Sequence, residues 1–145
     1  MTTALPRYAD TRSRWRRVRV PVLLAGGVLG ASVLLHLRDP HRGGSYGWCP
    51  WLLLTGTYCP GCGGLRAVND LTRGDVAAAA SSNLLFVATL PLFVLWWLQS
   101  VVDGLRGVVR PGYARAVVTG CVVFSVLAVG FWVLRNTPAG AWLAP

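Results

Sequence analysis

The chain contains no lysine and no glutamate, and charged residues make up only 13% of its 145 residues. A soluble domain carries about a quarter charged residues. All basic residues are arginines and all acidic residues are aspartates, while 54% of the chain is hydrophobic. Its length leaves room for one modest domain. The shortage of charge therefore argues against an ordinary soluble domain and predicts a protein in a lipid bilayer.

Several motifs of catalytic and transport proteins are also missing. The sequence shows no pair of carboxylates, no serine triad and no phosphate-binding loop. Its three long apolar runs contain no charged residue. Because pumps and ion channels place ionisable groups inside their spans, these classes are poorly supported. The absences favour a non-catalytic membrane protein over an enzyme.

Three apolar runs are candidates for membrane-spanning helices. They cover residues 20–37, 84–102 and 116–134. A run of about 18 residues, rising about 1.5 Å per residue, nearly crosses a hydrocarbon core of about 30 Å. No small-residue cleavage site follows the first run, so it is predicted to be an uncleaved anchor. The predicted fold class is an all-α integral membrane protein with three transmembrane helices, a cysteine-containing loop and a short interfacial helix.

The arginines predict how the chain crosses the membrane. Residues 1–19 form a basic tail, predicted to be disordered or interfacial, with six of the 14 basic residues. Three more arginines fall in the turn 103–115, on the same side as the tail. Loops rich in arginine stay in the cytoplasm. We therefore predict a multi-pass plasma-membrane protein with a cytoplasmic tail, a membrane domain over residues 20–145 and the C-terminus outside. The bilayer is the expected partner, another membrane protein is a further candidate, and nucleic acid is not expected.

The segment 38–83 joins the first two spans and is predicted to lie outside. Residues 65–72 have the apolar spacing of a short amphipathic helix. Asp75 is a plausible N-cap for the next helix. The alanines that follow predict a helix that continues through Ser81, Ser82 and Asn83 into the second span. Residues 48–54 are apolar but too short to span, and their tryptophans suit the membrane surface.

Cysteines in this segment follow the spacing Cys49-x9-Cys59-x2-Cys62, with Pro60, Gly61 and Gly63 around the closer pair. This pattern is typical of a zinc knuckle, in which a tight turn presents two thiolates to one ion. A closed structural zinc site needs four ligands. Cys49, Cys59 and Cys62 supply three, and His41 or His36 is the candidate for the fourth.

Two other interpretations of the cysteines stay open. Thiol–disulfide exchange would use Cys59 or Cys62 as the attacking thiolate, activated by a helix N-terminus and by Arg66. Alternatively, a disulfide from Cys49 to Cys59 or Cys62 would staple the loop on an oxidising face. Cys121, among apolar residues of the third span, is predicted to be a small packing residue.

The same residues resemble a known group of small bacterial membrane proteins, the domain-of-unknown-function family 2752. The resemblance covers roughly residues 49–95. It is carried by Cys49-Pro50, Leu54-Thr55-Gly56, Cys59-Pro60-Gly61-Cys62-Gly63, Arg66-Ala67, Leu71, Gly74-Asp75 and Asn83-Leu84. Leu65 stands where the group often has threonine.

The resemblance implies an integral membrane protein and no established activity. It also implies that Cys49, Cys59, Cys62, Arg66 and Asp75 belong to one unit. The predicted function is therefore a small polytopic membrane protein whose Cys-Pro-Gly-Cys-Gly loop has a structural, metal-held or partner-binding role, with zinc as the candidate cofactor. The alternative is a membrane thiol–disulfide oxidoreductase.

Overall fold

A computed structural model describes residues 8–9, 12–42, 46 and 49–144, and every structural statement below concerns these residues. Three helices are long and apolar enough to cross a membrane, which confirms the predicted all-α fold. They are α1 (Arg14–Leu37), α5 (Leu84–Arg106) and α6 (Tyr113–Arg135). The shorter elements are β1 (Tyr8–Ala9), α2 (Pro50–Thr55), α3 (Gly64–Thr72), α4 (Val76–Ser82), β2 (Val108–Val109) and the 3₁₀ helix η1 (Pro138–Leu143).

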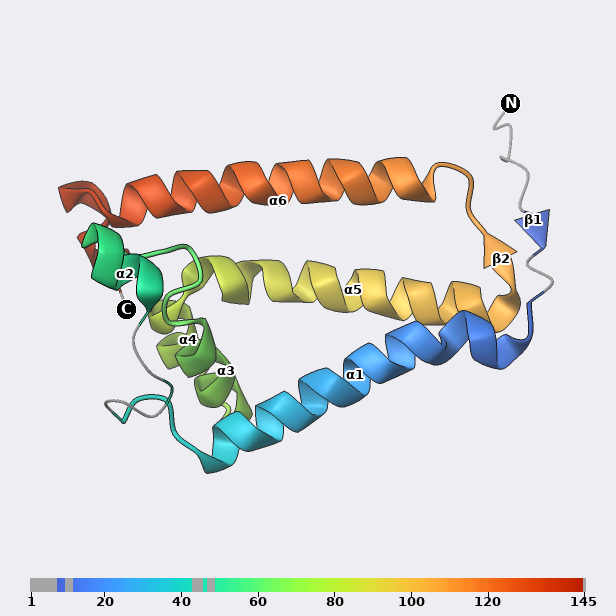
Figure 1. Cartoon of the computed structure of the whole chain (residues 1–145), viewed down its shortest axis with the longest axis horizontal. Helices are drawn as coiled ribbons and strands as arrows, with labels where there is room; N and C mark the ends of the chain where they lie inside the picture. Colours follow the sequence, from blue (N-terminus) through green and yellow to red (C-terminus); the bar gives the residue numbers. More distant parts are fainter. Residues whose placement is uncertain (1–7, 10–11, 43–45, 47–48, 145) are drawn as a thin grey trace.

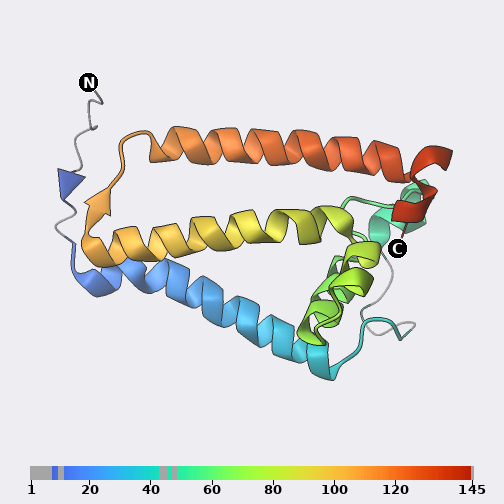
Figure 2. The ribbon, with the colours of Figure 1, turned by 180° about the vertical axis from the view of Figure 1, so that it is seen from behind.

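The long helices give the molecule two ends. Helices α5 and α6 run antiparallel, and α1 meets α5 near β2 but diverges from it toward the other end (Figures 1 and 2). Helices α3 and α4 fill the space between the end of α1 and the start of α5. β1 pairs antiparallel with β2 at one end, while α2 and η1 lie at the other.

Close contacts hold α1 against α5 near β2. The Trp97 indole donates a hydrogen bond to the Pro21 carbonyl (2.9 Å), and the Arg17 guanidinium donates to the Gly104 carbonyl (2.8 Å). A Cβ at Gly104 would lie 3.1 Å from a methyl of Val18 and 3.2 Å from the Arg17 carbonyl oxygen. Glycine is therefore the residue that lets the two backbones approach this closely.

Polar contacts hold the far end of α1 against α3. The buried Asn69 amide donates to the Leu35 carbonyl (2.7 Å), and the His36 ring is hydrogen-bonded to the Thr72 hydroxyl (2.9 Å). Between α3 and α4, Ser82 donates to the Asp70 carboxylate (2.9 Å). Burying polar groups is tolerable only when they are hydrogen-bonded in this way. Most of the buried residues among those described lie at this end of the protein, and about half of all buried residues are polar or charged.

The apolar faces of the long helices remain exposed. None of the most apolar stretch of α6 is buried, although its mean hydropathy is 2.4. Phe93 and Phe124 make one edge-to-face contact between α5 and α6, with ring centroids 5.7 Å apart. Because lipid tails solvate apolar side chains, such helices need no protein covering in a bilayer. The exposure agrees with three membrane-spanning helices.

Local boundaries differ from the sequence predictions in two places. Helix α1 begins at Arg14, so residues 14–19 are helical, which contradicts the disordered alternative for them and not the interfacial one. The predicted continuous helix through Ser81, Ser82 and Asn83 is wrong, because Asn83 is extended (φ −159°, ψ 94°) and separates α4 from α5. The segment 38–83 therefore holds α3, a separate α4, and α2, which was not predicted as a helix.

Candidate metal centre

The three loop cysteines converge on one point. The Sγ atoms of Cys59 and Cys62 are 2.9 Å apart, those of Cys49 and Cys62 are 3.4 Å apart, and those of Cys49 and Cys59 are 3.6 Å apart. All three cysteines are free and partly buried. These separations exceed a disulfide bond of about 2.05 Å. The structure thus brings together three thiols able to hold a metal ion, with no disulfide between them.

Short helices and turns build this arrangement. Cys49 precedes α2, in which Pro50 occupies the first turn, and Gly56 ends α2 in the left-handed region (φ 69°). The chain then returns through the Cys59–Cys62 turn, where the Cys62 amide donates to the Cys59 carbonyl (3.1 Å). The Cys59 amide also donates to the Cys62 sulfur (3.2 Å). An amide aimed at a sulfur is the feature expected of a knuckle that stabilises a thiolate.

Gly63 is the residue at which the chain leaves this turn and enters α3. Its φ of +83° lies in the left-handed region, which side chains with a Cβ seldom adopt. Gly61 lies within the turn, where an added Cβ would contact the Cys59 sulfur at 3.9 Å. The predicted role of the glycines in the turn therefore agrees with the geometry at Gly63, while Gly61 has ordinary room for a methyl group.

Two side chains from the ends of the spanning helices bind the backbone of this turn. The side-chain nitrogen of Asn83 donates to the carbonyls of Pro60 (2.9 Å) and Cys62 (3.1 Å). Its side-chain oxygen accepts from the Phe86 amide (2.9 Å) and so caps α5. Arg135, the last residue of α6, donates to the carbonyls of Cys59 (2.9 Å) and Cys62 (3.2 Å). The turn is therefore fixed to α5 and α6 together.

Arg135 is a buried cation. It is 2% exposed, and its second terminal nitrogen donates to the Leu143 carbonyl of η1 (2.9 Å). The guanidinium also lies over the rings of Phe131 and Tyr58, 4.8 and 5.8 Å from their centroids. Among the described residues no carboxylate pairs with it, and its Nε has no hydrogen-bond partner. An anionic group next to Arg135 would supply the missing countercharge.

Asn136, which follows Arg135, fixes the irregular segment that leads into the turn. Its amide accepts from the Tyr58 N–H and donates to the Tyr58 carbonyl, both at 2.9 Å. Trp132 of α6 packs edge-to-face on Trp51 of α2, with centroids 5.9 Å apart. The end of α6 therefore contacts both halves of the cysteine segment. The sequence analysis missed Arg135 and Asn136, whose only signal was a charge directly after an apolar span.

The two histidines do not join the sulfur cluster. His41 contacts carboxylates instead: its Nδ1 is 2.9 Å from Asp39 and its Nε2 is 3.4 Å from Asp70. His36 is hydrogen-bonded to Thr72. The group of metal-ligating atoms comprises the three cysteines. Neither histidine supplies the fourth ligand that was predicted.

Three other predicted site residues lie outside the sulfur cluster, and two of them stabilise helix ends. Asp75 is the N-cap of α4, where its carboxylate accepts from the Ala78 amide (2.8 Å), as predicted. The Thr55 hydroxyl closes the end of α2 by donating to the Trp51 carbonyl (2.8 Å). Arg66 is exposed on α3 and makes no hydrogen bond or ion pair within the described residues. The positive charge next to the cysteines thus comes from Arg135 and not from Arg66.

The environment shifts the pKa values of two of the thiols, Cys62 and Cys49, in opposite directions. Burial, followed by the hydrogen bonds of the two neighbouring thiols, raises the pKa of Cys62 to about 12. The pKa of Cys49 is lowered, chiefly by a hydrogen bond from the Leu52 amide at the start of α2. A nucleophilic cysteine needs a depressed pKa. As a free thiol, Cys62 is therefore a poor attacking group for disulfide exchange.

The sulfur geometry suits a tetrahedral metal ion. Zinc binds thiolates at about 2.3 Å, which places two thiolates of one tetrahedron about 3.8 Å apart. The pairs that involve Cys49 are already at 3.4 and 3.6 Å, and the Cys59–Cys62 pair must open by roughly 1 Å. A thiolate donor set also suits zinc over magnesium or calcium. The residues present therefore fit a zinc ion with three protein ligands.

Fold and site together define a small multi-pass membrane protein with a three-cysteine cluster at one end of its helices. Residues 49–97 match the family described as "Protein of unknown function (DUF2752)", which confirms the resemblance predicted from the sequence. The match runs from Cys49 through α2, α3 and α4 into α5, and leaves α1 and α6 outside. No curated protein and no solved structure was found to match.

Proposed function

We propose that Cys49, Cys59 and Cys62 bind one zinc ion, and that this centre is a structural and partner-binding element rather than a catalytic one. The observation that carries the proposal is the pairing of three adjacent sulfurs with the buried, uncountered charge of Arg135. Three thiolates on a divalent ion carry a net charge of −1. Arg135, hydrogen-bonded to the carbonyls of Cys59 and Cys62, balances that charge.

A disulfide or a thiol-exchange site would explain fewer of the observed features than a metal centre does. A disulfide between two of the cysteines is neutral, so it would leave Arg135 without a countercharge and the third cysteine unused. Thiol exchange requires an exposed, reactive thiolate. Cys62 has a raised pKa, and the turn is fixed on both sides by Asn83 and Arg135. A metal centre uses all three sulfurs and the buried cation.

Three ligands from the chain leave the fourth zinc position for water or for a side chain of a partner. A closed structural site has four protein ligands. Because neither histidine completes the set, the fourth ligand would come from a side chain of another membrane protein. Zinc would then link the two proteins, which is the partner-binding role proposed for the loop. Zinc would then hold the loop on α5 and α6 and present it at the membrane surface.

The first test counts thiols and metal in the intact protein. We expect about one zinc per chain in protein purified without chelators, measured by elemental analysis and native mass spectrometry. Alkylation of intact cells with a membrane-permeant reagent, followed by whole-protein mass measurement, should reveal no sulfur that requires reduction before it reacts. Two sulfurs that react only after reduction would contradict the proposal and establish a disulfide.

We also propose that the cysteine cluster faces the outside of the plasma membrane. Arginines concentrate near the opposite end, in the first turns of α1 and in the 103–115 segment, and arginine-rich ends stay cytoplasmic. Fusing an export-dependent phosphatase after Pro145 should give an active enzyme, whereas the same fusion before Met1 should be inactive. The opposite pattern of activity would mean that the orientation is inverted.

A further inference from the structure

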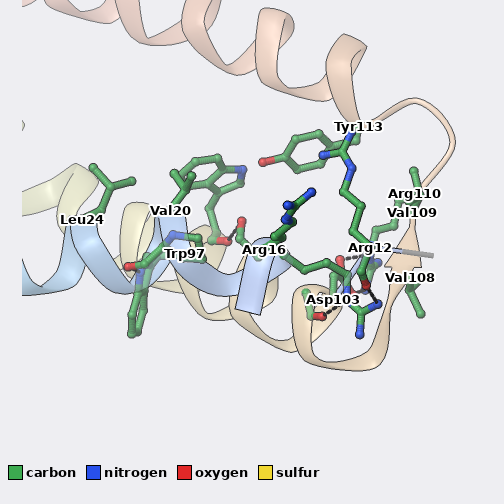
Figure 3. Close-up of a pocket in the computed structure, with 15 residues that line it drawn as sticks. Arg12, Arg16, Val20, Leu24, Trp97, Asp103, Val108, Val109, Arg110 and Tyr113 are labelled. Atoms are coloured by element: carbon green, nitrogen blue, oxygen red, sulfur yellow. Dashed lines mark hydrogen bonds and ion pairs between the residues drawn. The ribbon is translucent and has the colours of Figure 1, made fainter. Parts of the chain in front are cut away.

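A second feature lies at the end of the molecule away from the cysteines. There α1, α5, β2 and the start of α6 surround a cavity of about 380 Å³ (Figure 3). One side is basic and the other is apolar. Four arginines and one aspartate line it, which gives the cavity a net charge of +3. The cavity is separate from the proposed metal centre and does not depend on it.

The basic side of the cavity is held in place by its own contacts. The Arg110 guanidinium pairs with the Asp103 carboxylate through two hydrogen bonds, which neutralises the single acidic group. Arg17 is fixed to the Gly104 carbonyl and to the Arg12 carbonyl (2.6 Å). Arg16 is exposed, and Figure 3 shows its side chain rising from α1 toward Tyr113. Arg17 and Arg110 are thus held in place, and together with the exposed Arg16 they present positive charge that suits an anion.

Its apolar side continues along the membrane-spanning part of α1. This wall of the cavity is lined by Val20, Pro21, Leu24, Trp96 and Trp97. The Trp97 indole donates a hydrogen bond to the Pro21 carbonyl, which fixes its position. Val20 and Leu24 also line a second depression of about 460 Å³, which runs along α1 past Gly27 to Ala31. Because Gly27 and Ala31 have small side chains, they leave room for an alkyl chain. The two depressions therefore join a basic end to a shallow apolar groove on the surface of α1.

We propose that this joined site binds one anionic phospholipid. The phosphate lies against Arg16 in the positive field of Arg12 and Arg17, and one acyl chain follows α1 over Gly27 and Ala31. Arginine binds phosphate through a planar fork of donors, and tryptophan and tyrosine favour the headgroup level. The apolar continuation favours a lipid over a soluble phosphate compound, because a free anion would gain nothing from the groove on α1.

The test uses the full chain in detergent and native mass spectrometry with an equimolar mixture of phosphatidylglycerol and phosphatidylcholine. We expect one phosphatidylglycerol to be retained in preference to phosphatidylcholine. In Arg16→Gln that preference should fall roughly fivefold, since one basic residue near a charged membrane surface contributes about that factor. The matched control is Arg19→Gln on the same helix, because Arg19 is exposed and does not line the cavity.

A second variant tests the acyl-chain groove independently of charge. An added Cβ at Gly27 meets nothing within 4 Å, so Gly27→Leu should fold while filling the groove. We expect it to weaken lipid retention about tenfold, which is the loss of about two buried methylenes of the displaced chain. Equal retention of both lipids, or an equal effect of Arg19→Gln and Arg16→Gln, would overturn the proposal. Inorganic phosphate that displaces the lipid at millimolar concentration would instead identify an anion site, and would also overturn it.

Discussion

Replacing Cys59 with serine is expected to remove bound zinc almost completely. Cys59 is one of the three proposed ligands, and its sulfur lies 2.9 Å from that of Cys62 and 3.6 Å from that of Cys49. A serine hydroxyl is a far poorer ligand for zinc than a thiolate at neutral pH. Changes in groups that only support a ligand already cost about 10–100-fold in metal affinity, so losing a ligand should cost more. Elemental analysis should show zinc falling from about one per chain to background.

Cys121→Ser provides the matched control. Cys121 is exposed on α6 and is not a member of the sulfur cluster. Its replacement should leave the zinc content unchanged. Cys49→Ser should behave like Cys59→Ser, because the cluster has no spare protein ligand among the described residues. Zinc retained at full stoichiometry in both Cys49→Ser and Cys59→Ser would show that the ion binds elsewhere.

Loss of zinc should also loosen the loop while the spans persist. The turn would keep its hydrogen bonds to Asn83 and Arg135 but would lose the link between Cys49 and the Cys59–Cys62 pair. Hydrogen exchange in α2 should therefore increase in Cys59→Ser, whereas the amides of α5 should remain protected. Uniform loss of protection over all helices would mean that the metal holds the whole fold together and not only the loop.

Features determined by local sequence were predicted correctly. The spanning helices follow from long uncharged runs, since such runs are stable in lipid only as helices. α3 follows from its apolar spacing, and the Asp75 cap follows from a carboxylate placed before an alanine-rich helix. The Cys59–Cys62 turn follows from its proline and glycines. Each of these depends on residues within one or two helical turns of one another.

Features determined by distant residues were not predictable in the same way. Arg135 reaches Cys62 across 73 positions of sequence, and nothing at position 135 specifies that contact. His41 was a reasonable zinc ligand by composition, but in the fold Asp39 and Asp70 contact both of its ring nitrogens. At Asn83 the helical tendency of the preceding alanines gives way because the side chain caps α5 and binds the turn. Tertiary contacts decide these positions.

Replacing Arg135 with glutamine is expected to be the most destabilising single change at this end of the protein. Arg135 is buried and donates to the carbonyls of Cys59, Cys62 and Leu143. The shorter glutamine cannot reach all three, and each buried group left without a partner costs about 1–3 kcal/mol. A total of roughly 3–5 kcal/mol should lower the midpoint of thermal unfolding in detergent by about 6–20 °C. Zinc affinity should fall as well, because the anionic centre loses its countercharge.

Two further variants separate the roles of charge and geometry. Arg106→Gln, in the exposed last turn of α5, is the control for losing an arginine and should change stability by no more than about 0.5 kcal/mol. Arg135→Lys keeps the positive charge but not the planar fork that reaches several carbonyls. If charge balance is what zinc requires, Arg135→Lys should bind zinc nearly as well as the original protein while unfolding at a lower temperature. If Arg135→Gln binds zinc as tightly as Arg135→Lys, the guanidinium fixes the turn without balancing charge, and the charge argument for the metal centre fails.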